Sequence, residues 1–261
     1  MASINYSEKK KKEKEWHEQS SLNKEKGLIS SILHSKIFFS PERRKFEFNL
    51  MKTQMKLFVQ QHLKNKKVDK LLIAPCGNGV DYEYLNEFAN VIYGIDLSPI
   101  PLKECPQLMQ VKEGDILKSE YPNEFFEFIA SPLFFHHILS IGFEHFLNEF
   151  YRILKPGGYL IILEPSIFYP LNAFTRPLKK ITGNVYGEVE DEAPFDPRLL
   201  INSLTKTGFV NLDIKAASFG HMSLYIPIAK AIKFLTKPLL KTDKFWKYFA
   251  SVLLFWGEKP Y

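Results

Sequence analysis

Length, composition and charge set the first limits on this chain. It has 261 residues, of which 45% are hydrophobic and 25% charged, as in an ordinary globular protein with one sizeable core. Its two cysteines provide no disulfide framework, so we expect a reducing, cytoplasmic setting. The formal net charge of +6 is divided along the chain, because the ends 1–70 and 215–261 are basic whereas 71–214 is acidic. An acidic middle argues against nucleic acid as a partner.

The N-terminal part is expected to lie outside the sheet. Residues 1–26 are rich in lysine and glutamate, which predicts a disordered or helical lead-in, and they lack the apolar stretch of a secretory signal. Ser40 and Pro41 predict the start of a helix, because proline suits the first helical position. The apolar residues that follow share one helical stripe, so we expect 27–68 to form a helical cover.

The stretch 71–99 reads LLIAPCGNGVDYEYLNEFANVIYGIDLSP and is the most informative in the chain. It predicts a strand, a glycine-containing loop, a short helix and a second strand that ends at Asp96. Gly77 and Gly79 would let the loop backbone approach a ligand, and the Asp96 carboxylate could accept hydrogen bonds from a ribose diol. Tyr82 stands where a dinucleotide-binding loop has its third glycine, so a pyrophosphate is not expected. The stretch therefore indicates a nucleoside ligand.

Later apolar runs predict the remaining strands. The third strand leads to Asp115 and Ile116, an acid and an apolar residue that suit the two sides of an adenine. The Lys-Pro-Gly-Gly segment at 155–158 is expected to stop a helix before the fifth strand. Asp196 and Gly208 mark the two ends of another expected helix. The remaining strands are expected at 127–131, 159–163, 209–217 and 250–256.

In this order, the motifs from about 71 to 164 resemble those of class I S-adenosylmethionine-dependent methyltransferases, in the small-molecule branch similar to methyltransferase type 11. The resemblance implies an α/β, Rossmann-like fold with a seven-stranded, mostly parallel sheet, an antiparallel last strand and helices on both faces. The methyltransferase domain would span 27–261, and S-adenosyl-L-methionine would be the cofactor.

The resemblance also implies roles for individual residues. The Ala74–Gly79 loop would face the methionine part of the cofactor, Asp96 would bind the ribose hydroxyls, and Asp115 with Ile116 would lie at the adenine. The expected cofactor-binding residues are Pro75, Cys76, Gly77, Gly79, Asp96, Leu97, Asp115, Ile116 and Ser131.

Two histidines are the candidates for a catalytic base. His136 and His137 follow the end of the fourth strand, near the expected position of the methyl group, and imidazole can take a proton near neutral pH. In the family at least one histidine here is often structural. Tyr169 and His221 are second choices. No set of His, Cys, Asp and Glu has the spacing of metal ligands, so no metal is predicted.

Two positions depart from the family's pattern. Ile73 stands where the family has an acid, and Pro75 stands where it has a glycine. Proline fixes φ and lacks an N–H donor, so the entrance of the loop must be built differently. The lost carboxylate contact could pass to Asp81 or to the N-terminal segment. These departures leave open a non-catalytic protein that binds the cofactor with the same fold.

Two insertions, 166–194 and 219–248, are expected on the substrate side. In the first, aromatic residues predict a lid over an apolar acceptor, whereas the acidic residues indicate a solvated loop. The aromatic residues are Phe168, Tyr169, Phe174 and Tyr186, and the acidic residues are Glu188, Glu190, Asp191 and Glu192.

The second insertion predicts an amphipathic helix between Pro227 and Pro238. Its lysines share one face, and its apolar residues, among them Ile228 and Leu235, occupy another. We expect the apolar face to pack on its own domain, although peripheral contact with a membrane through 227–248 stays open. The apolar run 248–256 is too short to span a bilayer.

The predicted function is methyl transfer from S-adenosylmethionine to a small, apolar or aromatic and conceivably lipid-like acceptor, at oxygen rather than at carbon or nitrogen. The alternatives are a non-catalytic cofactor-binding protein, a peripheral membrane module and a nucleic-acid methyltransferase. The last is prompted by residues 131–134, which are one proline short of the loop of amino-group nucleic-acid methyltransferases.

Overall fold

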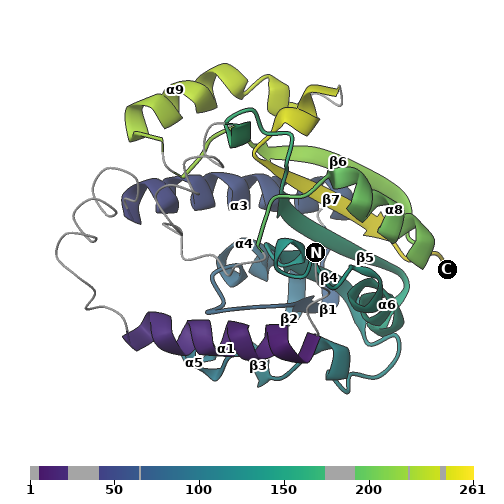
Figure 1. The fold of residues 1–261 in the computed structure, drawn as a ribbon. Helices are drawn as coiled ribbons and strands as arrows, with labels where there is room; N and C mark the ends of the chain where they lie inside the picture. Colours follow the sequence, from purple (N-terminus) through teal and green to yellow (C-terminus); the bar gives the residue numbers. More distant parts are fainter. Residues whose placement is uncertain (1–5, 23–40, 65, 174–191, 223, 242–244) are drawn as a thin grey trace.

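The structure is a computed structural model that describes residues 6–22, 41–64, 66–173, 192–222, 224–241 and 245–261. The described residues form a seven-stranded sheet with helices on both faces (Figure 1). The strands are β1 (Val68–Ile73), β2 (Ala89–Asp96), β3 (Met109–Glu113), β4 (Phe126–Pro132), β5 (Leu154–Pro165), β6 (Val210–Ser218) and β7 (Val252–Glu258). The helices are α1 (Tyr6–Leu22), α3 (Pro41–Leu63), α4 (Tyr82–Leu85), α5 (Pro99–Leu102), α6 (Glu144–Ile153), α8 (Pro197–Thr207) and α9 (Ile226–Thr236). The 3-10 turns are η2 (Asn86–Phe88), η3 (Ile116–Lys118), η4 (Phe135–His137), η5 (Leu239–Lys241) and η6 (Phe245–Phe249).

The strand order is β3-β2-β1-β4-β5-β7-β6. Strands β1 to β5 pair in parallel, whereas β7 is antiparallel to both of its neighbours. The predicted topology is therefore confirmed, and the carboxyl ends of the five parallel strands lie at one edge of the sheet. Ligands of open α/β sheets bind at this edge.

Helices cover both faces, which is why the central strands are apolar on both sides. Phe128 and Ile129 are neighbours on β4 and fully buried, but they belong to different cores. The Ile129 side lies under α6 and α8, and the Phe128 side lies under α3, whose Phe58 packs edge-on against Trp256 of β7. Because side chains alternate along a strand, β4 joins the two cores.

Strand β5 begins earlier than expected. The segment 155–158 was predicted to separate a helix from the strand, but the strand already pairs from Leu154 with Phe126. The register shifts before Phe128, so the Lys-Pro-Gly-Gly segment lies in an irregular part of the strand. A Cβ at Gly158 would come within 2.8 Å of the Lys155 carbonyl oxygen, which explains why a residue without a side chain stands there.

Helix α9 has the opposite orientation to the one we expected. Its buried residue is the small Ala229, whereas Ile228, Phe234 and Leu235 are 52%, 78% and 71% exposed. The expectation that the apolar face packs on its own domain is therefore wrong, because Ala229 lets the helix approach the domain from its other side. Within the described residues, no helix combines the length and hydropathy needed to cross a membrane.

A buried ion pair joins α3 to the residue before α4. The Lys52 ammonium contacts the Asp81 carboxylate, and the two side chains are only 4% and 6% exposed. Asp81 is therefore committed to Lys52. Each charge is removed from water and depends on the other for compensation.

Replacement of Lys52 by methionine should destabilise the fold, because it leaves the Asp81 carboxylate buried without its cation. We expect the free energy of unfolding to fall by about 3–5 kcal/mol in denaturant titrations. The double variant Lys52→Met/Asp81→Leu should recover most of this loss. The matched control is Lys56→Met, which breaks a partly exposed pair with Glu87 and should cost at most about 1 kcal/mol. Equal losses in the two single variants would contradict the prediction.

Candidate functional site

A pocket opens at the carboxyl edge of the sheet, where β1, β2 and β4 end. Six of the sequence-predicted residues line it, namely Pro75, Asp96, Leu97, Asp115, Ile116 and His137. Tyr6, Lys10 and Lys14 of α1 close one side, and Leu133, Phe134 and Ile138 form an apolar wall. The fold thus brings residues from four separate motifs and from the N-terminal helix to one place.

Asp96 is the last residue of β2, and its carboxylate is largely buried. One oxygen accepts a hydrogen bond of 2.8 Å from the Gly77 N–H, and the other accepts one of 2.9 Å from the Ser98 N–H. A carboxylate has about four acceptor positions, so this side chain keeps capacity for further donors in the pocket.

The loop after β1 is hydrogen-bonded to the sheet although Pro75 has no N–H to donate. The N–H of Ala74 donates to Ala130 of β4 at 2.9 Å, and the N–H of Cys76 donates to Ile95 of β2 at 3.0 Å. Pro75 lies between these two bonds, so its missing donor does not release the loop from the sheet. The departure at this position is therefore compatible with an ordered loop.

The two loop glycines have different reasons to be glycine. Both have positive φ, +51° at Gly77 and +74° at Gly79. A Cβ at Gly77 would meet nothing within 4 Å, whereas one at Gly79 would lie 2.7 Å from Pro106. Gly77 therefore leaves space beside Asp96, but Gly79, which we expected to approach a ligand, is constrained by packing on Pro106.

Asp115 joins the pocket to the N-terminal helix. Its carboxylate caps η3 by accepting from the Leu117 N–H at 3.0 Å, and it accepts from the Tyr6 hydroxyl at 2.5 Å. The Lys10 ammonium lies 2.9 Å from the other oxygen. Burial alone would raise the pKa of Asp115, but these hydrogen bonds and the lysine charge outweigh it and lower the pKa. The carboxylate is therefore held ionised.

His136 is turned toward a buried carboxylate. Its Nδ1 lies 2.7 Å from Glu164, the penultimate residue of β5, which is 1% exposed. The same carboxylate accepts backbone hydrogen bonds from Phe134, Phe135 and His136. Glu164 thereby fixes the turn η4 to the end of β5, and the His136 ring is part of this attachment.

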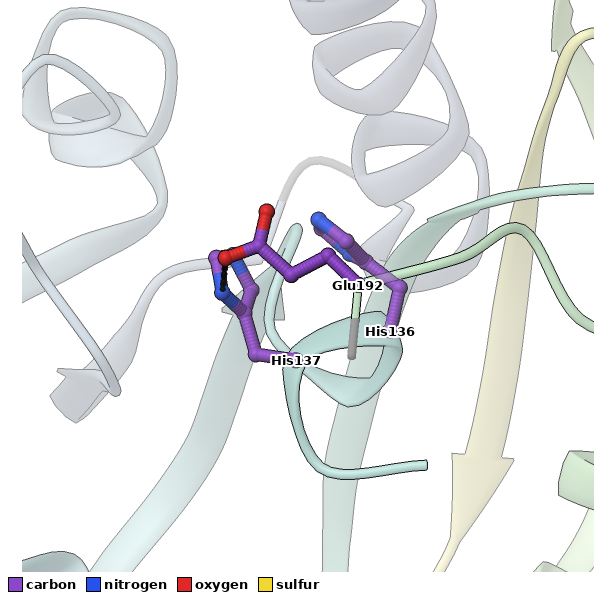
Figure 2. Close-up of side chains that lie close together, drawn as sticks. All are labelled: His136, His137 and Glu192. Atoms are coloured by element: carbon purple, nitrogen blue, oxygen red, sulfur yellow. Dashed lines mark ion pairs between the residues drawn. The ribbon is translucent and has the colours of Figure 1, made fainter. Parts of the chain in front are cut away.

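His137 is the histidine that lines the pocket. Its Nδ1 lies 2.8 Å from an oxygen of Glu192, and Figure 2 shows that carboxylate facing the ring, with His136 beside them. The two imidazole centroids are 4.2 Å apart. A proton on Nδ1 would face Glu192 and leave Nε2 as a proton acceptor, which is the arrangement a general base needs.

The same three residues offer donors for a metal. Atoms of His136, His137 and Glu192 lie within 4.8 Å of one another. The prediction that no metal binds rested on sequence spacing, which does not reveal a group assembled from residues 55 positions apart in the chain. Imidazole and carboxylate are common ligands of divalent metals, but Nδ1 of each histidine also lies at ion-pair distance from a carboxylate, that of Glu164 for His136 and that of Glu192 for His137.

Other predicted residues do not line the pocket. Cys76 is buried, and burial beside Asp96 raises the pKa of its thiol, so it is unreactive filler. Ser131 is fully buried in β4, and its hydroxyl makes no hydrogen bond to the described residues. Tyr169 donates to the Phe219 carbonyl at 3.0 Å and stacks on His221, whose pKa is lowered by burial. These two rings therefore hold the second insertion in place.

Part of the predicted lid lies outside the described residues. This applies to Phe174, Tyr186, Glu188, Glu190 and Asp191. Of the described members, Phe168 is partly exposed, Tyr169 is buried and Glu192 faces His137.

Sequence analysis missed three contributors to the site. The lysine-rich composition of α1 gave no sign that Tyr6 would reach Asp115, 109 residues away. Glu192 was grouped with its acidic neighbours, although it contacts a predicted catalytic residue. Glu164 could have been found, because an acid at the end of a parallel strand belongs to the ligand-binding edge.

Comparisons with known proteins agree with the fold. Residues 72–162 match the family model of the methyltransferase domain, type 11. An uncharacterized methyltransferase of Geobacillus kaustophilus is 23% identical over 165 residues, 60% of this chain and 74% of that protein. A demethylmenaquinone methyltransferase of a Geobacillus species is 23% identical over 158 residues, 52% of this chain and 67% of that protein.

Solved structures show the same fold. The crystal structure of an S-adenosylmethionine-dependent methyltransferase from Archaeoglobus fulgidus aligns with a TM-score of 0.54 and 17% identity, over 82% of this chain and 98% of that one. The matched family segment runs from β1 into β5 and includes the loop, Asp96, Asp115 and both histidines. The comparisons therefore support a class I S-adenosylmethionine-dependent methyltransferase whose residues 72–162 match the methyltransferase domain of type 11.

Proposed function

We propose that the pocket at the carboxyl edge binds S-adenosylmethionine and that the enzyme methylates a hydroxyl group of a small, apolar or aromatic acceptor. Asp96 would bind the ribose hydroxyls, Asp115 and Ile116 would hold the adenine, and the loop around Gly77 would face the methionine part. The observation that carries this proposal is the convergence of two carboxylates, those of Asp96 and Asp115, on one pocket at the carboxyl edge of the sheet.

The methionine end must be held without the acid that the family has at position 73. Ile73 is fully buried in β1, and Asp81 cannot replace the acid because its carboxylate is paired with Lys52 in the interior. The loop carbonyl groups are the acceptors that remain next to Gly77. Their use would keep the cofactor bound despite the departure from the family's pattern.

The acceptor side of the pocket is suited to an apolar molecule. Leu133, Phe134 and Ile138 line it, and Phe168 lies on the insertion that follows β5. One relative is named a demethylmenaquinone methyltransferase, which supports an acceptor of low polarity without identifying it. Apolar walls also exclude water from the space in which the methyl group moves.

His137 is the residue that we assign to proton removal. When bound, S-adenosylmethionine would supply an electrophilic methyl group, which would pass from the sulfonium sulfur to the acceptor oxygen. The acceptor hydroxyl must lose a proton in the same reaction, and Nε2 of His137 would take it when Glu192 faces Nδ1. Glu164 positions this histidine indirectly by holding the η4 backbone.

Replacement of Asp96 tests the cofactor site. Asp96→Ala should weaken S-adenosylmethionine binding at least about 100-fold in calorimetry, because it removes two charged hydrogen bonds to the ribose. Asp96→Asn keeps one acceptor oxygen and should lose less affinity. Comparison of the two variants separates the contribution of ligand binding from the support that the carboxylate gives to the loop. The control is Asp69→Ala, an exposed aspartate in β1 at the opposite edge. Near-normal affinity of folded Asp96→Ala would contradict the assignment.

Replacement of His137 tests the chemistry. Wild-type protein incubated with methyl-labelled S-adenosylmethionine and fractionated metabolite extract should transfer the label into a small apolar product. His137→Ala should lower this transfer about 100-fold or more and leave cofactor affinity unchanged, because the histidine acts on the acceptor. His145→Ala, in an exposed position of α6, is the matched control and should keep full transfer. Full activity of His137→Ala would exclude it as the base.

The same extract distinguishes the non-catalytic alternative, which Ile73 and Pro75 prompted. A protein that binds S-adenosylmethionine in calorimetry but labels no fraction of any extract would support a binding function. Transfer to any product would exclude that alternative.

A further inference from the structure

We propose that the outward face of α9, with the lysines beside it, docks on the surface of an anionic lipid bilayer. The surface consists of an apolar face (Pro227, Ile228, Ala231, Phe234 and Leu235) and a basic flank (Lys230, Lys233 and Lys237). Each of these eight residues is exposed.

The apolar face is continuous on the helix. With 3.6 residues per turn, its members fall within an arc of about 120° that points away from the domain. Ile228, Phe234 and Leu235 are all more than half exposed, and Tyr225, just before the helix, is 60% exposed. Three large apolar side chains exposed together on one helix are not needed for packing, and such a patch marks an interaction site.

The basic flank identifies the partner. The stretch 225–241 contains four lysines and no acidic residue. Lys230 and Lys237 lie within about 20° of one another on the wheel, beside the apolar face, and Lys233 follows about 40° further round, toward α3. An apolar face bordered by lysines is the pattern of a helix that lies in the interface of a bilayer and is attracted by anionic headgroups.

Two cation–π contacts link the region of α9 to the domain. The neighbour of α9 in the fold is α3 (Figure 1), where the Arg43 guanidinium lies 5.4 Å from the Tyr225 ring and the Lys233 ammonium 5.7 Å from the Phe46 ring. The chain leading to α9 is fixed where Ser218 donates to the buried Glu47 of α3 at 2.9 Å. Docking would therefore orient the whole domain.

The insertion that carries α9 leaves and rejoins the sheet at the edge where the pocket lies. It leaves the sheet after Ser218 and returns at Val252, and these two residues pair with each other next to Pro165 at the carboxyl end of β5. The surface is thus attached at the same edge as the pocket. This placement would suit an acceptor that partitions into the bilayer. That consequence rests on the proposed function, whereas the docking itself is independent of it.

Vesicle sedimentation with the full chain tests the proposal. At low salt the protein should sediment with vesicles of phosphatidylcholine mixed with phosphatidylserine, much less with phosphatidylcholine alone, and should be released by high salt. No cofactor or acceptor is needed, so a failure here is separate from a failure of the proposed function. Equal binding to both vesicle types, or no binding, would overturn the proposal.

Variants assign the binding to α9. Phe234→Ser/Leu235→Ser should abolish vesicle binding, and each of Lys230→Gln and Lys237→Gln should weaken it about five-fold. These side chains are exposed, so the melting temperature should not change. Leu108→Ser, at a residue 79% exposed beside β3, is the matched control and should bind as wild type.

The exposed face could instead hold a second copy of the chain. Size-exclusion chromatography with light scattering, without lipid, should show a monomer for both wild type and Phe234→Ser/Leu235→Ser. A wild-type dimer that the double variant dissociates would assign the surface to self-association and overturn the lipid assignment.

Discussion

The hydrogen bond from the Gly77 N–H to the Asp96 carboxylate joins the ends of two neighbouring strands. It forms because parallel strands bring the loop after β1 and the last residue of β2 to the same edge of the sheet. The bond holds the loop in a conformation with positive φ, which glycine adopts without strain. Because the second oxygen is also engaged, by Ser98, the carboxylate has one orientation, and everything that lines the pocket is arranged around it.

Glu164 fixes the turn η4 in the way that Asp96 fixes the loop after β1. A carboxylate that is 1% exposed would be costly without partners, and here it accepts three backbone N–H groups and faces an imidazole. These bonds turn the chain at η4 so that His136 faces inward and His137 faces the pocket. The two adjacent histidines therefore have separate roles, and the difference is set by backbone geometry.

Most of the sheet could be predicted from the sequence because β1, β2, β4, β5 and β7 each contain an apolar run. The strand-end acids could be predicted for the same reason, since their place in the sequence fixes the edge at which they lie. Contacts between distant segments could not be predicted. Tyr6 with Asp115, Lys52 with Asp81, and Glu192 with His137 depend on tertiary packing that no local pattern records.

Helix α9 shows the limit of a periodicity argument. The spacing of its residues correctly separated lysines from apolar residues, but it could not say which side meets the domain. That choice depends on the neighbouring surface, where the small Ala229 fits and the larger side chains do not. Hydrophobicity alone favoured the wrong side.

Asp115 serves two structures at once, because Tyr6 and Lys10 of α1 bind a carboxylate that also lines the pocket. For a ligand that contacts Asp115, docking of the N-terminal helix and occupancy of the pocket would be thermodynamically linked. Whatever factor the docked helix imposes on ligand affinity, the ligand must impose on docking of the helix. The position of the first turn of α1 would thus report whether a ligand occupies the pocket, most of whose residues lie much further along the chain.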